Sequence, residues 1–276
     1  MGKGFLYMTE LDLMQNLRSK SFWAYSFLFG AFVAVMFLSG VTESQIIGFV
    51  GLSRLMVTFM QVSMAILPIY VLITTVRSVV GDRESNVMEY MLSLPVSFSA
   101  YYWSKFVSKF LVIYIPVLFA LIVAVIWGSL KNLDVPWDLF FFYSALLAAL
   151  IFNFLGLGML ISSMAKSQEI AIGTAFIIWL ILVAFLDLLL MGLMLKMRMN
   201  PDLVIWGGMI NPLQIFRTGS LILFDPKLTV MGPASYYVLD VMGRNAFLIM
   251  SIAYPLFLGW LFAFLGSRYF NRNDVI

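Results

Sequence analysis

The sequence contains no cysteine and no histidine among its 276 residues. Without cysteine the chain has no disulfide, no thiolate metal ligand and no cysteine nucleophile. Without histidine it lacks the commonest metal ligand and proton shuttle, and a Ser-His-Asp triad is excluded. The phosphate-binding pattern G-x-x-x-x-G-K-[ST] is missing as well. We therefore expect that the chain is not an enzyme and binds no cofactor of its own.

Charged residues are also scarce. They make up 11% of the sequence, whereas hydrophobic residues make up 62%. A soluble domain carries about a quarter of its residues as charges, so the composition indicates an integral membrane protein. The net charge of +3 is explained by basic residues that flank membrane spans and calls for no nucleic acid.

The hydrophobic residues form six runs, each long enough to cross a bilayer at about 20 residues per helix. We expect an all-α protein with one transmembrane domain, residues 1–276, of six spans. An amphipathic helix at residues 4–20 is predicted to lie in the lipid interface before them. The predicted spans are Ser21–Gly40, Leu55–Val80, Phe106–Gly128, Trp137–Ser163, Glu169–Leu195 and Ala246–Ser267.

Side chains within these spans give further expectations. Pro68 should kink the second span. Gly156 and Gly158 should let another helix approach the fourth span closely. Lys105 and Lys109, at the start of the third span, are predicted to reach lipid head groups with their ammonium groups.

The distribution of basic residues orients the chain. Six spans place both termini on one side, and most lysines and arginines fall in the segments on that side. The two short loops on the other side hold only Arg54 and Lys131. By the positive-inside rule both termini are predicted to be cytoplasmic, in the cytoplasmic (inner) membrane of a bacterium or archaeon.

The stretch Gly81–Ala100 is an unusual polar run between the second and third spans. It predicts a cytoplasmic amphipathic helix at residues 82–94. Asp82 is expected to cap this helix, Glu84 to lie in its first turn, and Pro95 to end it. Its apolar face, open to a partner, would be Val87, Met88, Met91 and Leu92, with Glu89 between them. The alternative is a linker that lies flat on lipid.

The segment Lys196–Asn245 is long for a connection between two spans. We expect short helices at the outer face, interrupted at Asn211-Pro212, that dock a periplasmic partner or form an outer gate. The alternatives are a lid that packs on its own spans, and a poorly formed extra span.

Asp187 is the acid placed deepest in an apolar run, FLDLLLMGL. An acid at that depth needs a partner, so it is either a functional residue or a local structural one, and Arg217 is the predicted ion partner. The methionines just beyond it could bind Cu(I) through their thioethers, or could simply fill gaps, since the chain holds 19 methionines. They are Met191, Met194, Met197 and Met199.

The order of these features resembles the permease subunits of type-2 ABC exporters. That family has an interfacial helix, six spans and a cytosolic coupling helix with the pattern E-x-G-T-x-x-x-L-L-x-x-P-x-S. Here Glu84 begins the pattern, Asn86-Val87 replaces Gly-Thr, and Met91-Leu92 and Pro95 follow. The family's aromatic and basic tail corresponds to Phe270, Arg272 and Asp274. The resemblance implies a homodimer driven by a separate ATPase, which would bind the ATP and Mg.

Within that family the chain resembles most the NosY-type permeases of copper-enzyme maturation. Asp187 in FLDLLLMGL, Asn211-Pro212 and Phe216-Arg217 carry this likeness. It implies a NosF-like ATPase dimer, a NosD-like periplasmic partner and a role in assembling the copper–sulfide centre of nitrous oxide reductase, by export of a sulfur species or by driving the periplasmic partner. The open alternatives are a general exporter of drugs, lipids or polysaccharide, an ATP-independent channel or carrier, and a scaffold that only transmits motion.

Overall fold

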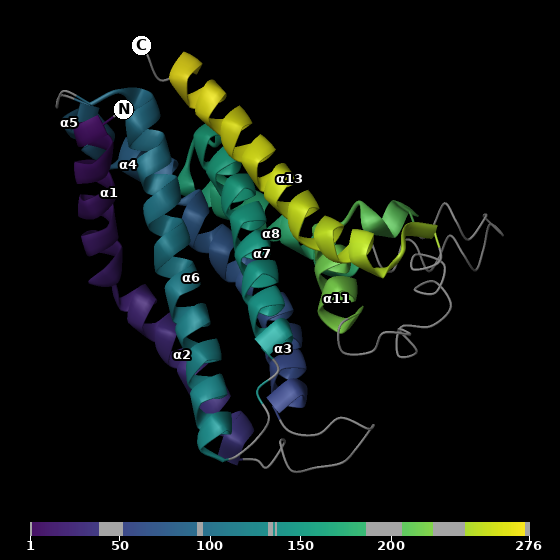
Figure 1. Ribbon diagram of the computed structural model, residues 1–276. Coiled ribbons are helices and arrows are strands. Elements are labelled where there is room, and N and C mark those ends of the chain that lie inside the picture. The colour runs from purple at the N-terminus through teal and green to yellow at the C-terminus, as the bar shows by residue number, and fades with distance from the viewer. Residues whose placement is uncertain are drawn as a thin grey trace.

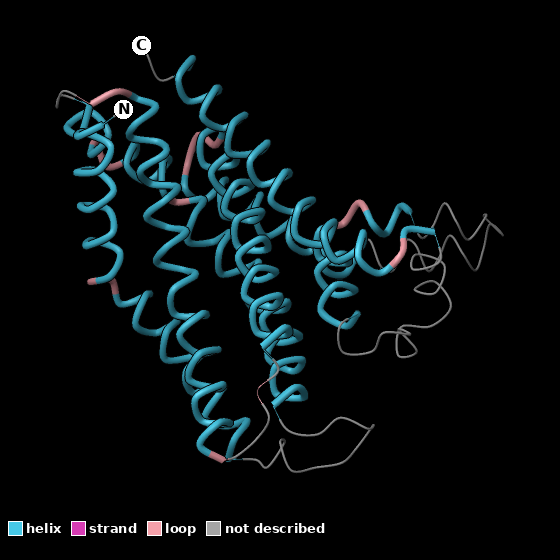
Figure 2. Tube along the Cα trace, viewed as in Figure 1, coloured by secondary structure: helices cyan, strands magenta, loops and turns pink. Residues whose placement is uncertain are grey.

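The computed structural model describes residues 2–38, 52–92, 96–131, 135, 137–185, 206–222 and 241–273. Over these ranges the chain is helical and contains no strand (Figures 1 and 2). The helices are α1 (Gly2–Leu17), α2 (Lys20–Leu38), α3 (Leu52–Val76), α4 (Ser78–Glu84), α5 (Val87–Leu92), α6 (Phe98–Leu130), α7 (Trp137–Met164), α8 (Gln168–Leu180) with a π-helical continuation (Ile181–Phe185), α11 (Pro212–Ile222) and α13 (Arg244–Asn273).

Four helical runs in the described residues are long and apolar enough to cross a membrane. They are Leu55–Glu84, Phe98–Leu130, Trp137–Met164 and Arg244–Arg272. Shorter apolar helices, Lys20–Val35 and Gln168–Ala184, overlap the first parts of the first and fifth predicted spans. The all-helical membrane architecture follows the prediction, and the count of six spans stays a prediction.

Two helices extend six or more residues beyond a predicted end, and a single side chain accounts for each extension. Helix α6 begins at Phe98 because the Ser97 hydroxyl accepts a hydrogen bond from the Ala100 N–H at 3.2 Å, which caps the helix. Helix α13 continues to Asn273, beyond the predicted end at Ser267. Phe270 holds this extension, since its ring is fully buried against Tyr101 and other aromatic side chains.

Helix α7 lies at the centre of the bundle and packs against α3, α6, α8, α11 and α13 (Figure 1). Its contact with α13 depends on two glycines that face each other. A Cβ on Gly156 would meet the Gly259 carbonyl, and a Cβ on Gly259 would meet the Phe152 carbonyl and the Asn153 Cα. A Cβ on Gly158 would likewise meet the Thr75 side chain. The close approach predicted for Gly156 and Gly158 is therefore confirmed.

Both chain ends lie at one end of the bundle, together with α1, α4 and α5 (Figure 1). The far ends of α2 and α6 and the starts of α3 and α7 lie at the opposite end. The surface segment between the second and third spans therefore shares its end of the molecule with both termini, as an even number of crossings requires.

Helix α11 is the longest described helix of the long segment before α13. Asn211 begins it, because its side-chain oxygen accepts from the Leu213 N–H at 3.0 Å and its amide donates to the Leu182 carbonyl at 2.7 Å. Leu213 and Phe216 are buried in the main core, and the Tyr143 hydroxyl donates to the Ser220 carbonyl at 2.6 Å. Helix α11 thus packs on other helices of the same chain.

Candidate functional site

The predicted surface helix at residues 82–94 is divided in two. Helix α4 ends at Glu84, Ser85 and Asn86 form a turn, and α5 begins at Val87. Asn86 has a positive φ of 58°, and its N–H bonds back to the Arg83 carbonyl at 3.3 Å. This left-handed residue closes α4 as glycine or asparagine commonly does after a helix. The expectation of one helix capped by Asp82 is wrong, because Asp82 lies inside α4.

Asp82 instead contacts α6 through its carboxylate, and α1 through Lys105. Its Oδ2 accepts from the Tyr101 hydroxyl at 2.5 Å and lies 2.7 Å from the Lys105 ammonium, both on α6. Lys105 also lies 3.5 Å from the carboxylate of Asp12 on α1. We call Asp12, Asp82, Tyr101 and Lys105 the ion cluster. It ties α4 to α1 and α6 by charge-assisted contacts in a half-buried position, where such contacts are stronger than in water.

Lys105 and Lys109, the two lysines of α6, contact polar side chains of α1, which the sequence did not predict. The Lys105 side chain is only 11% exposed within the ion cluster. Lys109 donates to the Asn16 side-chain oxygen at 3.4 Å. The reason is that α1 packs alongside α6 and offers polar side chains to both lysines. Burial raises the pKa of Asp12, and the positive charge of Lys105 partly opposes that rise.

The other side of α4 is hydrogen-bonded to the last turn of α7 and to Ala165 directly after it. The Ser162 hydroxyl accepts from the backbone N–H groups of Val79 at 2.9 Å and Val80 at 3.2 Å, which satisfies donors of the first turn of α4. The Arg83 guanidinium donates to the carbonyls of Ala165 at 3.2 Å and Ser163 at 3.4 Å.

Glu84 completes this side. Its carboxylate accepts from the Gln168 backbone N–H at 3.0 Å and the Gln168 side-chain amide at 2.7 Å. Glu84 therefore acts on the first turn of α8, where the helix dipole favours an acid, and not on the first turn of its own helix. Helix α4 is thus bonded directly to α6, α7 and α8, and through Lys105 to α1.

Helix α5 turns part of its surface away from the bundle. Tyr90 is 70% exposed and Val87 is 39% exposed, whereas Met88 is 8% exposed and packs in the core. The predicted apolar face is therefore divided between the bundle and the outside, and Met88 is not available to a partner. The side chains of Glu89, Met91 and Leu92, and all of Pro95, lie outside the described residues.

The ion cluster makes a stability prediction. Asp82→Asn should lower the free energy of unfolding by about 3 kcal/mol, since it leaves Lys105 with one distant carboxylate in a buried site. Thermal unfolding in detergent measures the loss. Glu10→Gln, at an exposed position of α1, is the matched control. The double variant Asp82→Asn with Lys105→Met should recover part of the loss; equal midpoints for Asp82→Asn and Glu10→Gln would show that the cluster contributes nothing.

Several predicted site residues lie elsewhere or outside the described part. Asn211 caps α11, and Arg217 is exposed on the same helix. Asp187 and the methionines Met191, Met194, Met197 and Met199 lie outside the described residues, so the pairing of Asp187 with Arg217 stays a prediction. Within the described ranges no group of three or more acidic side chains is placed to hold a metal ion.

The sequence did not predict that Tyr101 and Gln168 contact α4, or that Asp12 contacts Lys105. A signal existed for α1: Asp12 and Asn16 are four residues apart, as are Lys105 and Lys109, so two polar pairs at helical spacing could match across one contact. Nothing in the sequence singles out Gln168, because its role depends on α8 starting beside α4.

Comparison with known proteins gives two agreeing results. A family model described as ABC-2 family transporter protein matches residues 7–275. A protein of Stutzerimonas stutzeri named probable ABC transporter permease protein NosY is 24% identical over 233 residues, which cover 81% of this chain and 83% of that protein. Its namesake in Pseudomonas aeruginosa is 22% identical over 220 residues, which cover 78% of this chain and 80% of that protein.

Proposed function

The chain belongs to the ABC-2 family of transporter proteins, and on that premise we propose that it is the permease of a homodimeric ABC exporter driven by a separate ATPase. The ATPase would dock on the outward surface of α5 and the turn before it. The observation that carries this proposal is the position of α4, hydrogen-bonded to α6 on one side and to the α7–α8 connection on the other.

This arrangement would allow a displacement of α5 to reach several helices of the bundle. Tyr90 and Val87 offer exposed apolar surface at the end of the bundle that holds both termini. A partner that pushed or pulled α5 would move α4, because only the turn at Ser85 and Asn86 separates them. Through Asp82 and Glu84 the displacement would reach helices on both sides of the bundle. By the distribution of basic residues this end is cytoplasmic, where ATP is available.

The exposed apolar face of α8 supports a homodimer, because it could contact a second copy of the chain. Large apolar side chains on this helix are about half exposed, and a Cβ on Gly173 would meet no atom within 4 Å. An apolar face with a small residue at its centre suits close contact with another helix in a membrane. A symmetric pair is also the commonest assembly, and it matches an ATPase that acts as a dimer. The exposed side chains are Ile170, Phe176, Ile177 and Leu180.

The narrower proposal is a NosY-type role in copper-enzyme maturation, with a NosF-like ATPase and a NosD-like periplasmic protein as partners. The name of the two relatives supports it. The genes beside this one provide a first check: an ATPase gene next to a gene for a multicopper enzyme favours this role, and a drug-resistance or polysaccharide cluster favours a general exporter.

Reconstitution tests the function directly. The purified chain alone should hydrolyse no ATP, and with the ATPase encoded beside it should form a complex of two permease and two ATPase copies that hydrolyses ATP. Mass measurement in detergent gives the stoichiometry, and phosphate release gives the activity. ATP hydrolysis by the chain alone, or a stable complex containing one permease copy, would contradict the proposal.

A further inference from the structure

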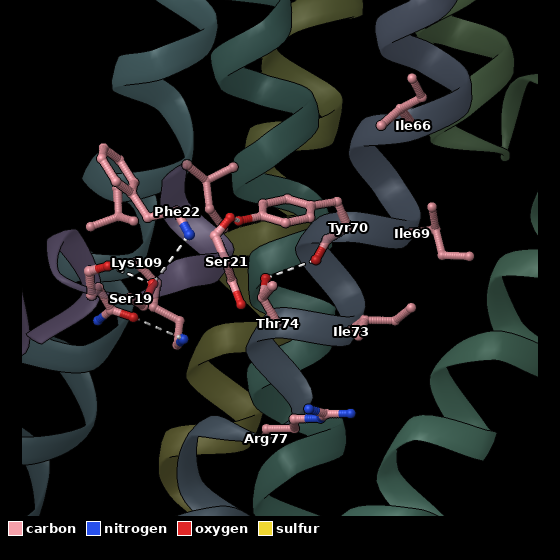
Figure 3. Close-up of a pocket in the computed structure, with 13 residues that line it drawn as sticks. Ser19, Ser21, Phe22, Ile66, Ile69, Tyr70, Ile73, Thr74, Arg77 and Lys109 are labelled. Carbon is pink, nitrogen blue, oxygen red and sulfur yellow. Dashed lines mark hydrogen bonds between the residues drawn. The ribbon is translucent and has the colours of Figure 1, made fainter. Parts of the chain in front are cut away.

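A cavity of about 530 Å³ opens between α2, α3 and α6, beside the junction of α1 and α2 (Figure 3). Its lining is polar and basic at one end, where Asn16, Ser19, Arg77 and Lys109 lie. Toward the other end it is apolar, with Ile66 and Ile69 on the wall formed by α3. A site of this volume is large enough for a small molecule or part of a lipid.

The change from basic to apolar follows the helix axes. Figure 3 shows Ile66, Ile69 and Ile73 in succession along α3, with Arg77 after them. Arg77 lies about 16 Å along the helix from Ile66, at 1.5 Å per residue. Helix α6 runs in the opposite direction, and its Lys109 precedes the apolar residues that line the same cavity. The cationic groups of both helices therefore lie at the end that also holds α4.

The basic end carries more positive charge than its carboxylates neutralise. A smaller adjoining cavity of about 220 Å³ is lined by Arg77, Lys105 and Lys109, and by the acids Asp12 and Asp82. Both acids contact Lys105. Among the described residues no salt bridge joins a carboxylate to Lys109 or Arg77, and Lys109 has only its long bond to Asn16. A half-buried cation at the edge of a membrane is costly without an anion.

We propose that this cavity binds an anionic phospholipid, with the phosphate held by Lys109 and Arg77 and an acyl chain along Ile66 and Ile69. The apolar end favours a lipid over a free anion, because a free anion would leave that wall in contact with water. The excess positive charge of the basic end favours an acidic lipid, whose head group has a net negative charge. In a zwitterionic lipid the head group's own cation would compete with Lys109 for the phosphate. The site goes beyond the proposed function and requires neither ATPase nor cargo.

The lipid would also act on the neighbouring ion cluster. Asn16 and Lys109 line both cavities, so a phosphate on Lys109 would lie next to the contact between α1 and α6. It would hold this contact closed by supplying the missing negative charge. An acidic lipid should therefore stabilise the folded protein, and a lipid without net charge should do so less.

Lipid retention and thermal unfolding of the full-length protein in a neutral detergent test the proposal. Native mass spectrometry should show palmitoyl-oleoyl phosphatidylglycerol retained with about 10-fold higher affinity than the phosphatidylcholine of the same chains. Phosphatidylglycerol should also raise the unfolding midpoint. Lys109→Gln should abolish most of the preference, and Lys131→Gln, an exposed lysine at the other end of α6, should keep it.

A further measurement decides whether the cavity binds a lipid or a soluble anion. Glycerol 3-phosphate carries the phosphate without acyl chains, and it should not raise the unfolding midpoint at the same concentration. An equal rise with glycerol 3-phosphate would overturn the lipid assignment in favour of a soluble anion. Equal retention of the two lipids would overturn the site itself. If Lys109→Gln fails to fold, Arg77→Gln decides, because its side chain is exposed: it should lose part of the preference, and an unchanged preference refutes the proposal.

Discussion

Gly156→Ala should prevent most of the protein from folding. The added Cβ would meet the Gly259 carbonyl, and backbone on both sides of the contact leaves no rotamer that relieves the clash. Helices α7 and α13 would have to separate where α7 occupies the centre of the bundle. We expect a cost of about 3 kcal/mol or more, at the upper end of overpacking effects, since backbone must move. The measurements are the yield of monodisperse protein in detergent and its unfolding midpoint.

Gly30→Ala is the matched control for this experiment. The same methyl group is added in the middle of a helix, but at Gly30 it would meet no atom within 4 Å. It should leave yield and midpoint unchanged, or raise them slightly, because alanine favours a helix more than glycine does. Equal behaviour of the two variants would mean that α7 and α13 are not in the close contact described.

Val87→Asp combined with Tyr90→Asp should abolish capture of the ATPase. Both side chains are exposed on α5, and a docked partner would enclose them. Each new carboxylate would then be buried without a cation, so the pair should weaken docking by about 100-fold or more. Co-purification of the tagged permease with its ATPase, at equal expression of both, measures the effect.

Tyr269→Asp is the control for that variant. Tyr269 is 38% exposed and lies near the C-terminus, at the same end of the bundle but on α13. It should leave ATPase capture intact. Normal capture by the α5 double variant would show that α5 lies on lipid and meets no partner, which is the alternative that the sequence left open.

At the turn between α4 and α5, the family pattern indicates a residue with an unusual backbone conformation but not the end of a helix. The family pattern places glycine where this chain has Asn86. The structure gives Asn86 a positive φ of 58°. Glycine adopts this conformation without steric cost, and asparagine tolerates it better than most residues. The replacement therefore keeps the conformational requirement, although the sequence could not show that α4 ends there.

The helices were predictable because apolar length determines a span. Gly156 and Gly158 were predictable too, because small residues mark close helix contacts. The partners of Asp82 and Glu84 were not, since Tyr101 and Gln168 reach them only through the packing of α4 against α6 and α8. The contacts of Lys105 and Lys109 with α1 were not predictable for the same reason. A lysine near the end of a span indicates an ammonium group that reaches lipid head groups, and only the structure shows a helix with polar side chains beside it.

A single-cysteine crosslink tests most directly whether α5 is the docking site of the ATPase. The chain has no cysteine, so Tyr90→Cys provides one reactive thiol without further changes. In membranes that contain the permease and its ATPase, a short thiol–amine crosslinker should join position 90 to the ATPase. Lys131→Cys, exposed at the opposite end of α6, should give no such product. No crosslink from position 90 in a complex that still co-purifies, or an equal crosslink from position 131, would contradict the account.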